Sequence, residues 1–428
     1  MKDIRQPVFP LTLGQRASFW VSAGVVTHIF WTSAAPALTY RLYAEQWPLT
    51  PTATTGIFAV YPIVVVAVLV GFGDLSDHIG RRATMLLGLG ASLIGTLLFA
   101  VAPDVLWLFA GRAFAGIGVG LTAGASTAAL VDFSAEGQST RAASVTTAAQ
   151  AFGFTGALLL GGALTQYAPW PTRLGFWLLF ALIALLFVAT WFLPRRLAGP
   201  ASRRWRPKSP SIPAGVRSAF ALAASAVTTA YTHGVLILSL GGQVGHDLIR
   251  SSNALINGAA LSLFAITSGM VGISARGLRP RPAMLLGAIA SVASMGLLAL
   301  SVAWQALSIF LASTAIAGIG YSLLVLGGLA LIGGAVPASH RGGVLSALYL
   351  FAYLSMGIVA LGLGVVATER GLGLAVDLGA AAIVLLSLGT IGLVTLQHRH
   401  GGQVTPRPSA ASAAASPLEH QSDRRINL

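Results

Sequence analysis

The stretch Gly73 to Arg82 reads GDLSDHIGRR and stands between two long apolar segments. Two acids, a histidine and two arginines so close together cannot lie in hydrocarbon, so we expect a tight turn at a membrane surface. Further along, Gly272 to Gly287 reads GISARGLRPRPAMLLG, where Gly73 to Gly88 reads GDLSDHIGRRATMLLG. The end glycines and the MLLG ending coincide at an offset of 199 residues. A charged turn at the same point of two copies of a membrane bundle is typical of a carrier.

The composition indicates that lipid covers much of the surface. The chain has 428 residues, of which 55% are hydrophobic and only 9% charged, and its mean hydropathy is +0.79. A soluble domain carries roughly 25% charged residues. The chain contains no cysteine, which excludes disulfides and thiolate metal sites, and we expect neither a metal nor a cofactor.

Apolar runs long enough to cross the bilayer recur along most of the chain. We predict an all-α integral membrane protein with twelve transmembrane helices in two pseudo-symmetric six-helix halves. The expected spans are residues 17–40, 52–73, 83–102, 105–131, 142–166, 173–194, 217–241, 252–275, 283–302, 304–335, 342–367 and 372–396.

The expected domain organisation follows from these spans. Residues 1–194 form the first half and residues 217–396 the second. Residues 195–216 are a basic, Pro-rich linker, and residues 397–428 form a disordered tail of Ala, Ser, Pro and charged residues.

Counting basic residues by loop predicts the orientation. If the N-terminus is cytoplasmic, 21 of the 26 lysines and arginines lie on the cytoplasmic side, and Arg112 lies inside a span. This is the positive-inside pattern, so we expect a multi-pass protein of a bacterial inner membrane with both termini cytoplasmic. The net charge of +14 then describes orientation and not nucleic-acid binding. The basic residues left on the outer side are Arg41, Arg173, Arg250 and Arg370.

The internal repeat shows at further points, with offsets between 200 and 205 residues. Parallel repeats of this kind build carriers whose binding site lies between the halves. The matched pairs are Ala115–Gly118 with Ala317–Gly320, Ser139–Arg141 with Ser339–Arg341, and Thr27-His28 with Thr232-His233.

The motifs resemble those of the major facilitator superfamily. Gly111 to Gly120 (GRAFAGIGVG) is similar to the span-4 signature, although Ala115 stands where many members have Gln. The span-5 glycine motif of antiporters is half present, with Gly161-Gly162 kept and Ala157-Leu158 in place of Gly-Pro. The loop 2–3 signature is matched by Gly73, Leu75, Asp77, Gly80, Arg81 and Arg82.

This resemblance covers about residues 15 to 396 and implies alternating access, with drug or metabolite:proton exporters the most similar members. It also implies that the loop 2–3 residues act as a latch at the cytoplasmic side. Asp77 suits a helix N-terminus, and we expect Arg81 to pair with Asp132 at the end of span 4. The alternative is that the turn only enforces topology. The predicted latch comprises Gly73, Asp74, Asp77, Gly80, Arg81, Arg82 and Asp132.

Arg112 is the strongest single candidate for substrate binding. An arginine within a span costs several kcal/mol, so it faces a partner or water and is functional by default. It would anchor an anionic or polar substrate, or modulate a nearby proton site. The alternative is that it snorkels toward the outer surface, since Asp104 is only about two turns away.

His28 and His233 are the candidates for proton coupling. They occupy equivalent places in spans 1 and 7. The resemblance to the major facilitator superfamily implies that these two spans line the central cavity. A histidine titrates near neutral pH, so a pair in a cavity could bind and release the driving proton. The alternative is that each packs against a neighbouring carbonyl. No Asp or Glu falls in the middle of any predicted span, which argues against strongly cationic substrates.

Further cavity candidates are neutral side chains that offer hydrogen bonds or aromatic surface. Tyr349 and Tyr353 are one turn apart and share a face. For each of these residues, a role in ordinary helix packing or at the lipid interface is at least as common as a role in the cavity. The candidates are Trp31, Gln150, Asn257, Tyr321, Tyr349 and Tyr353.

We therefore expect a secondary active transporter, functional as a monomer and not an enzyme, whose partners are a small-molecule substrate, protons and the bilayer. The leading prediction is proton-coupled efflux (antiport) of a small neutral or weakly anionic compound such as a drug, sugar or metabolite. The alternatives are a proton-coupled importer of a small carboxylate, with Arg112 on the acid group, and a transporter-like membrane sensor.

Overall fold

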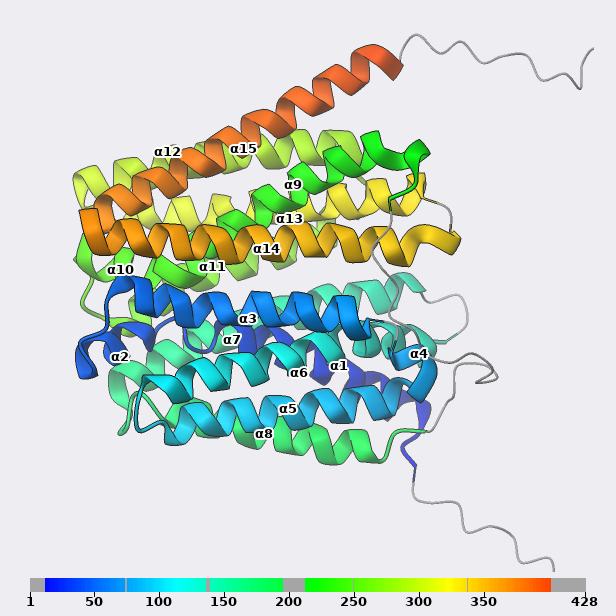
Figure 1. Cartoon of the computed structure of the whole chain (residues 1–428), viewed down its shortest axis with the longest axis horizontal. Helices are drawn as coiled ribbons and strands as arrows, with labels where there is room; N and C mark the ends of the chain where they lie inside the picture. The colour runs from blue at the N-terminus through cyan, green and yellow to red at the C-terminus, as the bar shows by residue number, and fades with distance from the viewer. Residues whose placement is uncertain are drawn as a thin grey trace, which may run out of the picture.

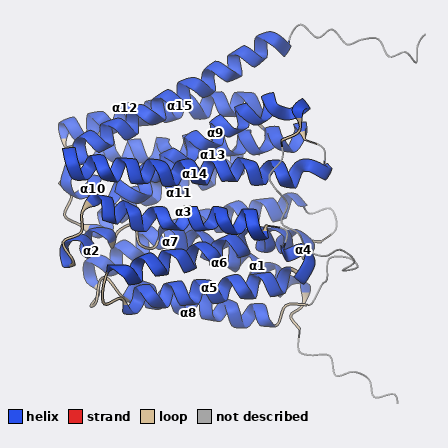
Figure 2. Ribbon diagram, viewed as in Figure 1, coloured by secondary structure: helices blue, strands red, loops and turns tan. Residues whose placement is uncertain are grey.

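The computed structural model describes residues 12–73, 75–135, 139–194, 212–248, 250–336 and 338–401. Every regular element within these ranges is helical, as Figure 2 shows. The first half contains α1 (Gln15–Ala34), α2 (Tyr40–Gln46), α3 (Pro51–Phe72), α4 (Leu75–Ile79), α5 (Arg81–Val101), α6 (Val105–Asp132), α7 (Ser139–Tyr167) and α8 (Leu174–Trp191).

The second half repeats this order, with one span built from several pieces. It contains η1 (Ala214–Val216), α9 (Arg217–Val235), η2 (Leu236–Leu240), α10 (Gly241–Gln243), η3 (Val244–Leu248), α11 (Ala254–Ser274), η4 (Ala275–Gly277), α12 (Pro280–Trp304), α13 (Leu307–Ala335), α14 (Ala338–Arg370) and α15 (Leu372–Gly401). The pieces η2 and η3 are π-helical turns, which carry the seventh span on to Leu248 instead of residue 241.

The predicted fold class is confirmed: the described chain forms twelve long helical spans in two six-helix halves. Eleven of these spans are long and apolar enough to cross a membrane. The other is α1, which is 20 residues long but carries buried polar side chains such as Ser18, Ser22 and His28. At 1.5 Å per residue it still spans about 30 Å. Its polar residues face neighbouring helices, so its low hydropathy reflects its interior position.

The two halves lie side by side (Figure 1). Their contact is made by α3 against α14 and by α7 against α11. We call the end of the bundle that carries Gly80, Asp132, Pro194 and Ile212 the linker face, and the opposite end the distal face. Of the predicted linker, residues 195–211 lie outside the described residues, and η1 and α9 begin at its end. α15 runs to Gly401, beyond the predicted end at 396, and residues 402–428 of the predicted tail lie outside the described residues.

Glycines let two helix pairs approach at equivalent places in the halves. A Cβ built on Gly88 would lie 2.7 Å from the carbonyl oxygen of Gly118, so α5 and α6 touch backbone to backbone. A Cβ on Gly287 of α12 would lie 3.0 Å from the carbonyl oxygen of Gly320 of α13. The two pairs differ in sequence number by 199 and 202 residues, the offsets of the repeat. The duplication seen in the sequence is therefore a duplication of helix packing.

We predict that Gly118→Ala destabilises the protein while Gly124→Ala, further along α6, does not. A Cβ at Gly118 would collide with Ser92 Oγ, and overpacking of this kind costs about 1–3 kcal/mol. A Cβ at Gly124 would meet no atom within 4 Å, and Ala is the better helix former. Thermal unfolding of the two purified variants in detergent measures the difference, and equal melting temperatures would contradict the backbone contact.

Candidate functional site

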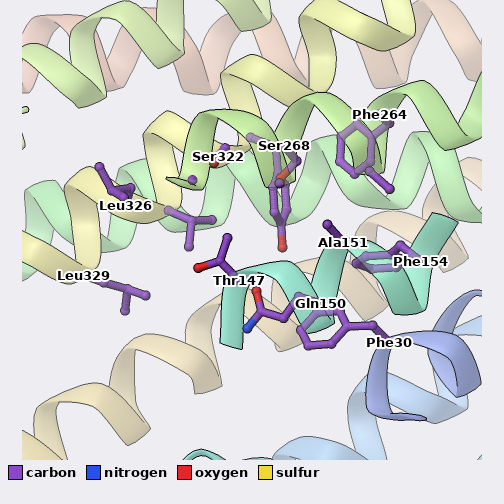
Figure 3. Close-up of a pocket in the computed structure, with 15 residues that line it drawn as sticks. Phe30, Thr147, Gln150, Ala151, Phe154, Phe264, Ser268, Ser322, Leu326 and Leu329 are labelled. Carbon is purple, nitrogen blue, oxygen red and sulfur yellow. The ribbon is translucent and has the colours of Figure 1, made fainter. Parts of the chain in front are cut away.

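A cavity of about 200 Å³ lies between the two halves. It is bounded by α1 and α7 of the first half and by α11 and α13 of the second. Figure 3 shows Thr147 and Gln150 projecting from α7 into the space bounded by Ser268 and Ser322. Apolar side chains make up most of the remaining wall, including Phe154, Phe264, Leu326 and Leu329.

A second chamber of about 50 Å³ continues from the first. The two share Phe30, Phe154, Phe264 and Tyr321, so they form one central cavity. The second chamber also takes walls from α3, α9, α14 and the π-helical turn η2, which contributes Leu238. Turns of this type are frequent at functional sites because they interrupt a regular helix. No charged side chain lines either described chamber.

Four of the eight tyrosines line the second chamber, whereas Tyr349, also expected in the cavity, packs behind Tyr353. The ring of Tyr231 lies 5.0 Å from Tyr353, nearly perpendicular to it, and 6.2 Å from Tyr321. Tyr349 extends this cluster, with its ring 6.4 Å from Tyr353. Tyr61 of α3 lines the chamber from the first half. The rings provide apolar surface and their hydroxyls provide hydrogen bonds, a combination suited to organic molecules with polar groups.

Arg112 lies one layer behind this chamber and is only 1% exposed. Its guanidinium carbon stands 4.4 Å from the Tyr61 ring centroid and 5.7 Å from that of Phe58. Nη1 donates to the carbonyl oxygens of Thr32 and Ser33, at 3.5 and 3.4 Å. Snorkelling is thus wrong as an account of Arg112, because the side chain points into the bundle and not toward the surface.

The charge of Arg112 is incompletely satisfied. Its Nε and Nη2 have no hydrogen-bond partner, and no carboxylate pairs with it among the described residues. Cation–π contact with Tyr61 and Phe58 supplies part of the missing stabilisation. A buried cation of this kind makes the electrostatic potential of the neighbouring chamber positive. The side chains that line the chamber are therefore uncharged, while the buried guanidinium behind them makes its electrostatic potential positive.

The structure places His28 and His233 away from the central cavity. His28 Nδ1 lies 2.8 Å from the carbonyl oxygen of Val25, and its Nε2 lies 3.0 Å from Ser92 Oγ on α5. His233 Nε2 lies 3.3 Å from Ser294 Oγ on α12. The expectation that the pair lines the cavity is therefore corrected: each is fully buried inside its own half. Each histidine has a serine partner on the third long span of its half, but Ser291, not Ser294, occupies the place of Ser92 in the repeat.

The predicted pair between Arg81 and Asp132 is present, with Arg81 Nε 3.5 Å from Asp132 Oδ2. Arg81 Nη1 also donates to Ser76 Oγ at 2.6 Å. Arg82 Nη1 donates to the Leu193 carbonyl oxygen at 3.3 Å. These contacts all lie within the first half, at its linker face. They join α4, the start of α5, the end of α6 and the segment after α8.

The remaining residues of the turn fix its path. Gly80 adopts a φ of 89°, a left-handed conformation that favours glycine, at the joint between α4 and α5. Gly73 follows the end of α3, where a Cβ would approach the carbonyl oxygen of Leu69. Asp74 and the side chain of Asp77 lie outside the described residues. The role of this turn as a latch stays a prediction.

The other sequence candidates divide between the cavity and the periphery. Gln150, Tyr321 and Tyr353 line the cavity as expected. Trp31 instead lines a separate groove between α1, α7 and α8. Asn257 lies near the distal face, where its Nδ2 donates to the Ser251 carbonyl oxygen at 2.9 Å. Both are on the expected helices, but Trp31 faces the groove beside α8 and Asn257 lies too close to the distal face to reach the cavity.

Sequence reasoning missed Tyr61 and Tyr231. A signal for Tyr231 was available, because it directly precedes the repeated Thr232-His233 pair. Tyr61 directly precedes Pro62, which lies inside the continuous helix α3. A proline within a helix is a common cause of a bend, and it marks this part of α3 in the sequence.

The distal face of the cavity is closed by polar contacts between the halves. Thr52 Oγ1 lies 2.7 Å from Thr368 Oγ1 and donates to the Gly364 carbonyl oxygen at 3.1 Å. Gln166 Oε1 accepts a hydrogen bond of 2.7 Å from the backbone N–H of Ala254. Toward the other end, the cavity reaches Gly272, two residues before the end of α11. The cavity is thus sealed distally and extends toward the linker face.

Two helical halves around one shared cavity define a carrier-type membrane protein. Residues 20–279 match the sequence profile of the Major Facilitator Superfamily, which is more than half of the chain. The chain therefore belongs to this superfamily of transporters and is a multi-pass membrane protein.

Individual relatives are similar over shorter stretches. The cephamycin export protein CmcT of Amycolatopsis lactamdurans is 29% identical over 43% of this chain and 37% of its own length. The multidrug efflux pump LfrA of Mycolicibacterium smegmatis is 32% identical over 31% of this chain and 27% of its own length. The human vesicular acetylcholine transporter is 28% identical over 39% of this chain and 31% of its own length. The chain thus matches little more than a third of these relatives at most.

Solved structures agree with the fold over nearly the whole chain. A bacterial homologue of the human lysosomal transporter Spinster, in an inward-facing and unoccupied conformation, superimposes with a TM-score of 0.71 at 14% identity, covering 92% of this chain and 99% of that one. The peptide transporter POT in complex with sulfate gives a TM-score of 0.73 at 15% identity, covering 92% and 96%. At these identities the likeness concerns the fold alone.

We predict that Thr52→Cys with Thr368→Cys traps the distal face closed. The two side chains are already in contact, and the natural chain has no cysteine that could form a competing disulfide. Oxidation should form the cross-link and abolish exchange across a vesicle membrane, and a reducing agent should restore it. Either single cysteine variant is the control. Full exchange in the cross-linked protein would mean that the distal contact does not open during transport.

Proposed function

We propose that this chain is a secondary active transporter that exports a small neutral or weakly anionic organic compound by alternating access, driven by protons. The observation that carries the proposal is the uncharged, tyrosine-walled cavity between the halves, with Arg112 behind it. Alternating access needs a site that both halves share and a seal that can form at either end. The cavity has walls from both halves and is sealed distally by Thr52 and Thr368.

The orientation in the membrane is argued from charge. Among the described residues, the basic residues lie at the linker face except for Arg112 inside the bundle and, toward the distal face, Arg41, Arg173, Arg250 and Arg370. Basic residues favour the cytoplasmic side, so we place the linker face and both chain ends in the cytoplasm of a bacterial cell. The described conformation, sealed distally, then faces inward and is ready to take substrate from the cytoplasm.

The electrostatics of the cavity support a neutral or weakly anionic substrate. A cationic molecule would approach the guanidinium of Arg112 with no lining carboxylate to compensate. Opposite charges attract more strongly in the low dielectric of a protein interior than in water. The hydroxyls of the tyrosine cluster and the amide of Gln150 would orient polar groups of the substrate. Export as the direction is supported by two relatives whose names describe an export protein and an efflux pump.

Proton coupling is assigned to His28 and His233. Since they lie behind the cavity, their protonation would act through helix packing and not by contact with substrate. A protonated His28 would have to donate from both ring nitrogens, to Val25 and to Ser92. A change at this joint between α1 and α5 alters how α1 lines the cavity through Phe30 and Ser33.

The alternative is a proton-coupled importer of a small carboxylate. The observation that favours it is the unpartnered Nε and Nη2 of Arg112, which a carboxylate could satisfy if Tyr61 moved aside. A transporter-like sensor would bind a compound without moving it across the membrane, which vesicle transport assays distinguish directly.

We predict that Arg112→Gln weakens binding of weakly anionic substrates at least about tenfold, roughly 1.4 kcal/mol, while leaving neutral substrates less affected. Protein in liposomes with a trapped pH-sensitive dye is screened with matched phenols, aromatic carboxylates and aromatic amines. Each compound whose transport changes the internal pH is then titrated to measure its apparent affinity. Arg41→Gln is the control, because Arg41 lies at the distal face and pairs with Glu45. An equal loss of affinity for all three compound classes would mean that Arg112 serves the packing of the protein and not substrate binding.

We predict that His28→Gln combined with His233→Gln uncouples transport from the pH gradient. Glutamine keeps a hydrogen-bonding side chain beside Ser92 and Ser294 but does not titrate. Counterflow of a labelled substrate should persist, whereas substrate flux should no longer change the internal pH. Persistent acidification by the double variant would place the proton site elsewhere. His246→Gln, on the distal π-helical turn, serves as the matched control.

A further inference from the structure

The groove that contains Trp31 has a volume of about 250 Å³, more than either chamber of the central cavity. It lies within the first half, between α1, α7 and α8, and is separate from the central cavity. Its wall is almost wholly apolar. Two of its lining residues, Leu160 of α7 and Leu178 of α8, are each 48% exposed, so the groove opens on the outer surface of the bundle. In a membrane that surface faces hydrocarbon.

Two glycines create the space. A Cβ built on Gly161 of α7 would meet no atom within 4 Å, and one built on Gly175 of α8 would meet only Leu164, at 4.0 Å. Elsewhere in this half, glycines such as Gly88 and Gly118 serve close helix contact. Gly161 and Gly175 do not, and they leave a gap between α7 and α8 that no side chain fills.

The second half packs more closely where α15 meets α14 and η2. A Cβ on Gly379 of α15 would lie 3.0 Å from Leu236 and 3.1 Å from Leu363. Around Gly161 and Gly175, on the matching helices α7 and α8, no neighbour comes closer than 4.0 Å.

The groove runs from the distal end of the bundle toward its middle. Thr39 and Pro171 line it near the distal face, and Leu182 lines it eight residues into α8, about 12 Å deeper at 1.5 Å per residue. Water has too few polar partners along such a wall, so an apolar occupant is required to fill the space. A hydrocarbon chain entering from the distal leaflet has the right shape and depth.

A charged residue stands at the distal end of the groove. Arg173 is exposed and lies between the lining residues Pro171 and Gly175. No carboxylate pairs with it in the part of the chain that the structure describes. A phosphate is the natural partner of such a guanidinium at a membrane surface.

We propose that this groove binds one phospholipid of the distal leaflet, with an acyl chain between α7 and α8 and its phosphate on Arg173. The chain fills the space left by Gly161 and Gly175 and contacts Trp31. Since α7 also lines the central cavity, the lipid supports a helix on which the transport site is built. The proposal is independent of the substrate and of proton coupling.

The test is lipid binding to purified, delipidated protein, titrated with dioleoyl phosphatidylglycerol and followed by native mass spectrometry. The wild-type protein should retain one lipid in preference to further ones. Gly161→Leu fills the groove and should weaken that binding at least about tenfold, as one leucine replaces the contacts of several methylenes. Gly389→Leu is the matched control, since Gly389 is an exposed glycine of α15 with open space around it. Gly175→Leu is a second filling variant.

Two further measurements separate the parts of the proposal. Arg173→Gln should weaken binding of phosphatidylglycerol but not of dioleoylglycerol, which lacks the phosphate. A phosphatidylglycerol with brominated acyl chains should quench a fluorescence component that Trp31→Phe removes. Equal lipid binding by the filling variants and by Gly389→Leu would overturn the proposal. So would a filling variant that keeps the lipid but loses affinity for a transported compound, because the groove would then belong to the substrate.

Discussion

The structure depends on one constraint: inside hydrocarbon every backbone polar group needs a partner within the protein. Helices meet this need locally, and the small hydroxyl side chains follow the same rule. Ser22, Thr96 and Thr122 each donate to the carbonyl oxygen four residues earlier in their own helix. These residues are polar in composition but behave as space-filling groups. The side chains that cannot be satisfied in this way are the informative ones, and Arg112 and His233 are among them.

The two halves share the packing of their helices, but the residues that line the cavity and the groove differ between them. Glycine contacts between α5 and α6 recur between α12 and α13, including the contact of Gly118 with Ser92, which recurs between Gly320 and Ser291. The tyrosine cluster has no such symmetry, because only Tyr61 comes from the first half. The groove with Trp31 is lined by the first half, whereas Gly379 of α15 in the second half packs against Leu236 and Leu363. The two halves therefore share their internal packing but contribute different walls to the cavity.

The sequence was sufficient for the fold because hydropathy and repeat offsets are properties of whole segments. The spans from α3 to α6 lie within two residues of the predicted ones at each end. The face of a helix is a finer property. Trp31 and Asn257 were assigned to the cavity by their helices. Trp31 instead faces the groove beside α8, and Asn257 lies in the first turn of α11, near the distal face. Tyr231 directly precedes the repeated Thr232-His233 pair, but its contacts with Tyr353 and Tyr321, which place it at the cavity, are visible only in the structure.

Arg112 links the packing of the first half to the chemistry of the cavity. Its guanidinium is held between α1, through the carbonyl oxygens of Thr32 and Ser33, and α3, through the rings of Phe58 and Tyr61. Both helices also line the cavity, through Ser33 and Tyr61. A negative group that enters beside Tyr61 would compete for the same cation, and the contacts of Arg112 with α1 and α3 would weaken as it did so. If Arg112 acts on the substrate as proposed, the same guanidinium would couple the occupancy of the cavity to the packing of α1 against α3.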